Sequence, residues 1–235
     1  ADIPEEEVIR LFLILGCAAA AFAQADPNFH GWYQYFGDHP VNGTRWGIHL
    51  EGQVRRHDVA RSWQNLLLRP AVNFNVNKYL DLTAGYAYVS YHRYGEHPGR
   101  PGHEHRLFQD FKVRHEVGKV VLQHRLRFEN RWVTTLPSYE NRFRYTLRGT
   151  VPIGKSRHYV TAWNEMFTPV APETFPSFSD QNRAAVLWGR KINKYWRTEV
   201  GYMLQTVWQR NRLVREDNHT LVISLWSTQP FGKRN

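Results

Sequence analysis

The sequence contains almost no cysteine, since Cys17 is the only one among its 235 residues. Cys17 lies in LFLILGCAAAAFAQA, an apolar run that resembles the hydrophobic region of a signal peptide. The run ends in Ala23-Gln24-Ala25, a small-residue cleavage motif, so we expect residues 1–25 to be removed on export. The mature chain would then have no disulfide and no thiol chemistry.

The residues before this run lack the positive charge with which a signal peptide begins. They read ADIPEEE, and a simple explanation is that the true start is Val8, so that Arg10 supplies the charge. The stretch ILGC, which ends at Cys17, also resembles a lipoprotein box. The sequence leaves open whether Cys17 is lipidated.

Beyond residue 25 no run of apolar residues approaches the roughly 20 that a transmembrane helix needs. Any crossing of a membrane by the exported chain must therefore use strands. There is also no linker, low-complexity tract or exact repeat. We expect a short aromatic segment over residues 26–43 and one β-barrel domain over residues 44–235.

Catalytic motifs are missing as well, because the chain has no G-x-S-x-G, H-E-x-x-H or P-loop pattern. An outer-membrane hydrolase could still place a histidine base beside a carboxylate at its extracellular rim. The candidates for such a site are His57 with Asp58 and Asp217 with His219. Solvated rim residues are the simpler interpretation of both pairs.

Three loop histidines, His97, His103 and His105, have a spacing that could bind a metal. A polar loop is the better explanation of them and needs no ligand. We therefore expect no metal and no cofactor.

The sequence is rich in arginine and in aromatic residues. The net charge is +10 and aromatic residues make up 14% of the chain. Arginine recurs at every second position through most of the chain, with Glu and Asp interspersed, whereas a nucleic-acid site would concentrate the charge on one exposed patch. The pattern therefore favours an internal or solvated ion lattice and no nucleic-acid partner.

Side chains alternate between apolar and charged over long stretches, with the period of a β-strand. The strands would average roughly 12 residues, longer than the ~5–6 usual in soluble sheets and suited to a tilted membrane crossing.

Short turns alternate with longer connections, as in outer-membrane barrels. We predict an all-β fold, an antiparallel up-and-down transmembrane β-barrel of about ten strands, with twelve as the alternative. The predicted strands are 44–56, 62–76, 79–92, 104–116, 119–133, 140–151, 157–168, 180–192, 196–210 and 216–231. An even number would leave both ends of the barrel chain at the short-turn side.

A tight hairpin at Val117-Gly118 would set charged residues of opposite sign across from each other. Its register pairs Asp110 with Arg125, Arg106 with Glu129, and Glu104 with Arg131. The same register places Phe108 against Arg127. Other strands continue this charged face, and the predicted lumen network comprises Glu51, Arg55, Glu104, Arg106, Asp110, Arg125, Arg127, Glu129, Arg131, Arg142, Arg144, Arg148, Arg183, Arg197 and Glu199.

Alternation alone does not say whether the apolar face points inward or outward. A soluble lipocalin-like barrel has it inside, and a membrane barrel turns it toward lipid. The signal sequence, the long regular strands and the C-terminal stretch LVISLWSTQPF favour the membrane barrel. The mean hydropathy of −0.59 does not count against it, because half of each strand would face a polar lumen.

Several stretches also resemble a known family. They are WGIHLEGQVRRHD, LLLRPAVNFNVNKYLDLTAGYAYV, EHRLFQDF, HRLRFENRW, NRFRYTLR, SDQNR, EVGYMLQ and DNHTLVISL, and they cover nearly all of the mature chain. The family consists of uncharacterised bacterial proteins, catalogued as a domain of unknown function and predicted to form outer-membrane barrels. The resemblance implies a fold and a location, and it brings no catalytic residues.

We therefore expect a monomeric protein of the Gram-negative outer membrane with a charged, mostly plugged lumen and a non-catalytic, membrane or transport-associated role. Its partners would be outer-membrane lipid and lipopolysaccharide, whose phosphates suit arginines near the long loops. The alternatives are an outer-membrane hydrolase and, third, a periplasmic β-protein that binds a small apolar ligand. Because arginine is in excess, a narrow anion-preferring path also remains open.

Overall fold

The computed structural model describes residues 29–92, 101–134, 139–170, 179–208 and 215–232. The predicted signal peptide with Cys17 and the loop residue His97 lie outside the described residues. Within the described ranges, no helix has the length and apolarity that a membrane crossing would require.

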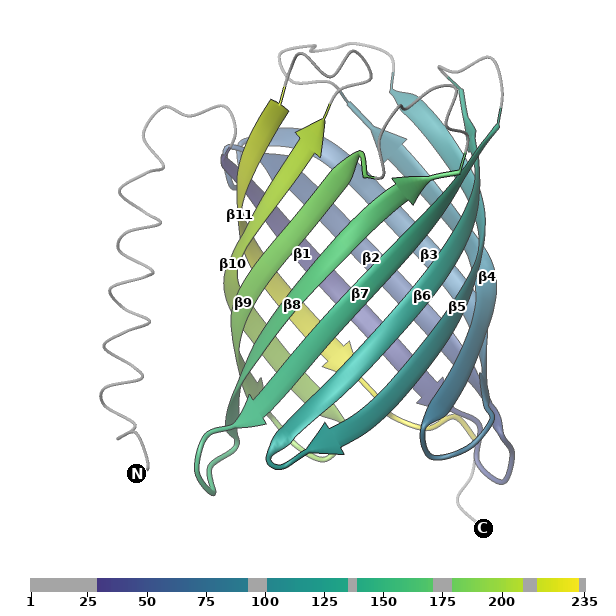
Figure 1. The fold of residues 1–235 in the computed structure, drawn as a ribbon, viewed down its shortest axis with the longest axis vertical. Coiled ribbons are helices and arrows are strands. Elements are labelled where there is room, and N and C mark those ends of the chain that lie inside the picture. Colours follow the sequence, from purple (N-terminus) through teal and green to yellow (C-terminus); the bar gives the residue numbers. More distant parts are fainter. Residues whose placement is uncertain (1–28, 93–100, 135–138, 171–178, 209–214, 233–235) are drawn as a thin grey trace.

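Eleven strands close into one barrel, with the strands tilted against its long axis (Figure 1). The strands are β1 (Phe29–Pro40), β2 (Trp46–His57), β3 (Ser62–Asn75), β4 (Leu80–Tyr91), β5 (Gly102–Val117), β6 (Val120–Val133), β7 (Glu140–Pro152), β8 (His158–Pro169), β9 (Gln181–Lys191), β10 (Trp196–Trp208) and β11 (Arg215–Ser227). Consecutive strands pair antiparallel, and β1 closes the barrel by pairing parallel with β11. The all-β barrel prediction is confirmed, with a strand number between the two that the sequence suggested.

Strand β1 is the one strand that the alternation of side chains does not predict. The ten predicted strands correspond to β2–β11, whereas Phe29–Pro40 lies in the segment that was set apart from the barrel. The outward side of β1 carries glycines where the other strands carry aliphatic residues. At Gly31 a Cβ atom would lie 2.1 Å from the carbonyl oxygen of Val59, so the turn after β2 approaches the outer side of β1. Because the close approach requires glycine at this position, β1 lacks the alternating apolar residues by which the other strands are recognised.

The connections differ between the two ends of the barrel. The short-turn rim carries residues 41–45, 76–79, 118–119, 153–157 and 192–195, and it lies at the bottom of Figure 1. At the opposite end, the long-loop rim, residues 58–61 join β2 to β3, and β4, β6, β8 and β10 end there before the longer connections. With eleven strands, β1 begins at the long-loop rim and β11 ends at the short-turn rim. The expectation that both ends share one rim was wrong, because it assumed an even strand number.

The hairpin between β5 and β6 closes one residue later than predicted. Val117 pairs with Val120, and the turn is Gly118 and Lys119. Gly118 has φ = +60°, the left-handed conformation that glycine provides at the first central position of a two-residue hairpin. All predicted partners across this pair therefore shift by two positions. A shift of two keeps every side chain on its predicted face and changes only its direct neighbour.

The barrel is apolar outside and charged inside. Large apolar side chains are exposed on its outer surface, among them Leu126 at 54% and Phe143 at 51%. Charged side chains are buried within it, among them Glu129 at 0% and Arg127 at 1%. A soluble lipocalin-like barrel has the reverse arrangement. The apolar interior that a periplasmic carrier of small apolar ligands would need is absent from most of the described inner wall.

Candidate functional site

The barrel encloses a cavity of about 1380 Å³. Inward side chains of all eleven strands line it, from His30 and His57 at the long-loop rim to Arg45 and Thr228 at the short-turn rim. Among the described lining residues are fourteen cationic side chains and eight carboxylates. The lumen is therefore a polar space with an excess of positive charge, and it is less completely filled than the sequence suggested.

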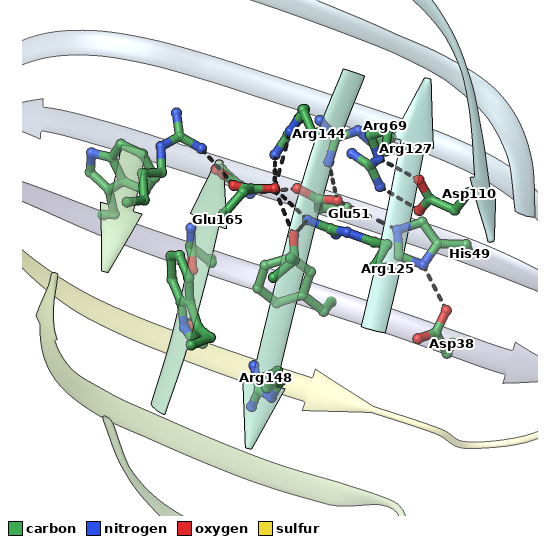
Figure 2. A pocket seen from close by; sticks show the side chains of 18 of the residues that line it. Asp38, His49, Glu51, Arg69, Asp110, Arg125, Arg127, Arg144, Arg148 and Glu165 are labelled. Carbon is green, nitrogen blue, oxygen red and sulfur yellow. Dashed lines mark hydrogen bonds and ion pairs between the residues drawn. The ribbon is translucent and has the colours of Figure 1, made fainter. Parts of the chain in front are cut away.

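Arg127 lies at the centre of the charged wall. Its Nε and Nη2 donate to the two carboxylate oxygens of Asp110 on the neighbouring strand, at 2.6 and 2.7 Å (Figure 2). The guanidinium group also lies over the ring of Phe108, 4.4 Å from its centroid. Bidentate pairing fixes the orientation of Arg127, and its burial strengthens the attraction.

Glu129 joins β6 to β7 and is completely inaccessible. Its carboxylate accepts hydrogen bonds from Arg144 Nη1 at 2.6 Å and from Arg142 Nη2 at 2.7 Å. The guanidinium group of Arg106 lies 3.8 Å away. A buried carboxylate is tolerated where its oxygens are satisfied in this way, and here one negative charge serves several positive ones.

Glu165 on β8 is shared in the same manner. Its Oε1 accepts from Arg125 at 2.6 Å and from Arg144 at 2.7 Å, and Figure 2 shows both guanidinium groups directed at it. Arg183 Nη1 lies 3.4 Å from the other oxygen. The three arginines come from β6, β7 and β9, so the carboxylate links three neighbouring parts of the wall.

A second group of charges lies on β1, β2 and β3. Glu51 is paired with Arg69, and His49 lies between two carboxylates, with its Nδ1 2.7 Å from Asp38 and its Nε2 3.5 Å from Glu51 (Figure 2). Lys112 approaches Asp38 at 3.9 Å. This side of the lumen is closer to neutral than the side formed by β6–β9.

Aromatic rings hold many of the arginines against the wall. The guanidinium groups of Arg142, Arg144 and Arg183 lie 4.5 to 5.0 Å from the ring centroid of Phe167. Trp32 is covered in the same way by Arg55 at 3.7 Å. Cation–π contacts favour this stacking, and most of the ion pairs join neighbouring strands. Because the arginines lie along the wall, they leave the cavity open beside them.

The predicted lumen residues all lie on the inner side. All but Glu129 line the cavity, and Glu129 is buried between its arginines. Their partners follow the corrected register. Arg131 still bonds Glu104, diagonally, whereas Arg125 bonds Glu165 in place of Asp110.

Sequence reasoning missed several members of this network, namely Asp38, His49, Arg69, Lys112 and Glu165. Alternation along HYVTAWNEMF could have placed Glu165 on the inner face, in phase with its neighbours. Asp38 lies in β1, which was not recognised as a strand.

The structure places the two candidate histidine–carboxylate pairs differently. His57 lines the cavity at the long-loop rim, with its ring edge-on to that of His30, and Asp58 follows in the turn with φ = +50°. Asp217 accepts hydrogen bonds from Thr206 and Arg215, on the outer side of β11.

His219 belongs to a recurring outward arrangement in which a tyrosine hydroxyl meets a histidine Nδ1 across two strands. The distances are 2.6 Å for Tyr202 and His219, 2.7 Å for Tyr88 and His103, and 2.8 Å for Tyr145 and His124. Tyr86 and His105 form a fourth pair. Each bond satisfies a ring nitrogen on an otherwise apolar surface, which is a structural role.

Comparisons with known proteins agree with the extent of the barrel. A family model described as "Protein of unknown function (DUF2490)" matches residues 29–216, from the first residue of β1 into β11. The chain is also similar to an uncharacterised protein of Methylorubrum extorquens, with 30% identity over 212 residues, which is 84% of this chain and 88% of the relative. No solved structure matches the chain.

Proposed function

The chain belongs to the DUF2490 family of proteins of unknown function, and from its structure we propose that it is an outer-membrane β-barrel whose arginine-lined lumen accepts and passes small anions. The role is transport-associated and needs no catalysis.

The reversed distribution of polarity carries the first part of this proposal. Exposed apolar side chains on the outer surface are stable against lipid, while the buried ion pairs require a polar or self-satisfied interior. Trp132, near the end of β6, is exposed and does not line the cavity, as expected of an aromatic side chain at a membrane interface. The signal peptide expected over residues 1–25 supports the same location.

The excess of cations supports the second part. Fourteen lining cations against eight lining carboxylates make the cavity electropositive. Rings of arginine and lysine attract anions into a pore and repel cations. The arginines are stacked on aromatic rings and paired along the wall, and therefore do not fill the cavity. The residues that line the cavity extend from one rim to the other.

Cell fractionation tests the location. The full chain should sediment with the outer membrane and change its gel mobility on heating, as barrels do. Recovery from the soluble periplasmic fraction would contradict it.

Conductance in planar bilayers tests the anion path. Under a potassium chloride gradient, the reversal potential should have the sign of chloride selectivity. Arg45→Glu, at the short-turn mouth of the cavity, should move that potential toward the cation value, because a lining charge is reversed. The matched control is Arg157→Glu, an exposed turn residue outside the cavity lining, which should leave it unchanged. Cation selectivity of the unmodified protein would overturn the anion preference.

A further inference from the structure

One part of the lumen wall differs from the rest in being apolar. Trp32, Leu187 and Met203 are buried there together with Ala185 and Val222, and Trp163 packs against them. These residues come from β1 and β8–β11, which are neighbours in the closed barrel. Trp32, Leu187 and Trp163 also line the cavity, so the patch is part of its surface.

Two arginines stand against this patch. The guanidinium carbons of Arg55 and Arg183 lie 3.7 and 4.8 Å from the ring centroid of Trp32. Arg55 comes from β2, which pairs with β1, and Arg183 comes from β9, which β10 and β11 separate from β1. Because both guanidinium groups lie against the same ring, two positive charges are brought together at one place on the wall.

Each of these arginines is oriented by a neutral amide. Gln53 accepts from Nε and Nη2 of Arg55 at 3.1 and 2.7 Å. Gln181 accepts from Nε and Nη2 of Arg183 at 2.9 Å when its amide oxygen faces the guanidinium group. Both glutamines precede their arginine by two residues on the same strand. At the corresponding position before Arg106 the chain has Glu104, a carboxylate.

Because an amide stands where Arg106 has a carboxylate, the positive charges of Arg55 and Arg183 are not compensated by the residue that orients them. Among the described residues, Arg55 has no carboxylate within ion-pair distance, and the carboxylate nearest Arg183, Glu165, is shared with Arg125 and Arg144. In addition, the buried indole Nε1–H of Trp32 has no acceptor in the described part of the chain. Cations inside the barrel that are only partly neutralised, and a buried donor without an acceptor, are costly unless an anion meets them.

We propose that Arg55, Arg183 and Trp32 form a binding site for an organic carboxylate with an aromatic or other apolar part. The carboxylate would accept from the two guanidinium groups, and its apolar part would pack against Leu187 and Trp163. The site is reached from the long-loop rim, where β2 ends and β9 begins. The inference rests on the proposed function, because it names the class of anion that the lumen accepts.

The test uses the purified full chain in a non-ionic detergent, titrated calorimetrically with benzoate, acetate and inorganic phosphate. Benzoate should bind at least about tenfold more tightly than acetate, because its ring buries apolar surface. Arg55→Gln and Arg183→Gln should each weaken benzoate binding roughly 10- to 100-fold, the range for losing hydrogen bonds to a charged group. The matched control is Arg190→Gln, on the same strand as Arg183 and exposed on the outer side, which should bind as the unmodified protein does.

Arg55→Lys keeps the charge and loses the planar fork, so its affinity should lie between those of the unmodified protein and Arg55→Gln. If a glutamine variant fails to fold, Arg55→Lys must still bind benzoate more weakly than the unmodified protein does, and unchanged binding would overturn the site. Absence of benzoate binding, equal binding by the lysine and glutamine variants, or tighter binding of phosphate than of benzoate would overturn the site. Because binding is measured without a membrane, a protein that binds benzoate but lacks anion selectivity would refute the proposed function and leave this site standing.

Discussion

Asp110 and Arg127 lie directly opposite each other on β5 and β6, joined by two hydrogen bonds and almost inaccessible to solvent. Asp110→Asn removes the charge and leaves Arg127 buried without its counter-ion. The free energy of unfolding should fall by about 3–5 kcal/mol, the cost of breaking one partner of a buried pair. Denaturant titration followed by tryptophan fluorescence measures it.

The double variant Asp110→Leu with Arg127→Met is the control for this pair. It removes both charges together, so its loss of stability should be clearly smaller than that of Asp110→Asn. A double variant that loses more than the single one would show that the pair is not the source of the effect.

Leu126 tests the outer surface. It lies in the middle of β6 and is exposed. If lipid covers it, Leu126→Arg should destabilise the barrel in phosphocholine vesicles by about 2–4 kcal/mol, whereas Trp132→Arg, near the end of the same strand, should cost only about 0–1 kcal/mol. Equal and negligible effects in both variants would indicate that water, and not lipid, surrounds the barrel.

Gly118 tests the corrected hairpin. Because its φ is +60°, Gly118→Val should destabilise the protein by about 1–2 kcal/mol. Gly118→Asn should cost less, since asparagine tolerates the left-handed region. Refolding and unfolding curves of the two variants give the comparison, and similar losses in both would argue for a different turn.

The parallel closure can be tested with cysteines, because Cys17 is the only natural one. Tyr35 lies opposite Leu225 in the pairing of β1 with β11. Replacing both with cysteine should give an intramolecular disulfide on mild oxidation, seen as a shift in gel mobility that reducing agent reverses. Tyr35→Cys combined with Ile223→Cys is one step out of register on the same face and should cross-link far less. Equal cross-linking of the two pairs would indicate a sliding or different seam.

The sequence predicted ten of the eleven strands because their two faces differ sharply in polarity. In β6, Leu126 and Phe128 alternate with Arg125 and Arg127, and the structure has them on opposite sides. Strand β1 lacks this contrast. Its outer side includes Gly31, which the turn after β2 covers, and Gly37, which lies against the side chains of Tyr35 and His39 on the same strand, so local alternation carries little information there.

The sequence predicted which charged residues face the lumen, but it predicted their ion-pair partners less well. Alternation places arginines and carboxylates on the inner face, but a turn that differs by one residue changes every direct neighbour, as at Asp110. Contacts between distant strands, such as that of Arg148 on β7 with Glu199 on β10, depend on barrel closure and have no local signature. Arg69 was overlooked because its neighbours on the inner face of β3, Leu67 and Ala71, are apolar and carry no charge pattern.

The odd strand number gives the barrel a sidedness. Phe29 at the start of β1 and Ser227 at the end of β11 lie at opposite rims (Figure 1). Across a bilayer, the two ends of the folded polypeptide would face different compartments. β1 could not insert as half of a hairpin with β11, since parallel neighbours share no turn, and one terminus would have to be carried across during assembly. Epitopes inserted directly before β1 and directly after β11 should accordingly be labelled from opposite sides of the membrane.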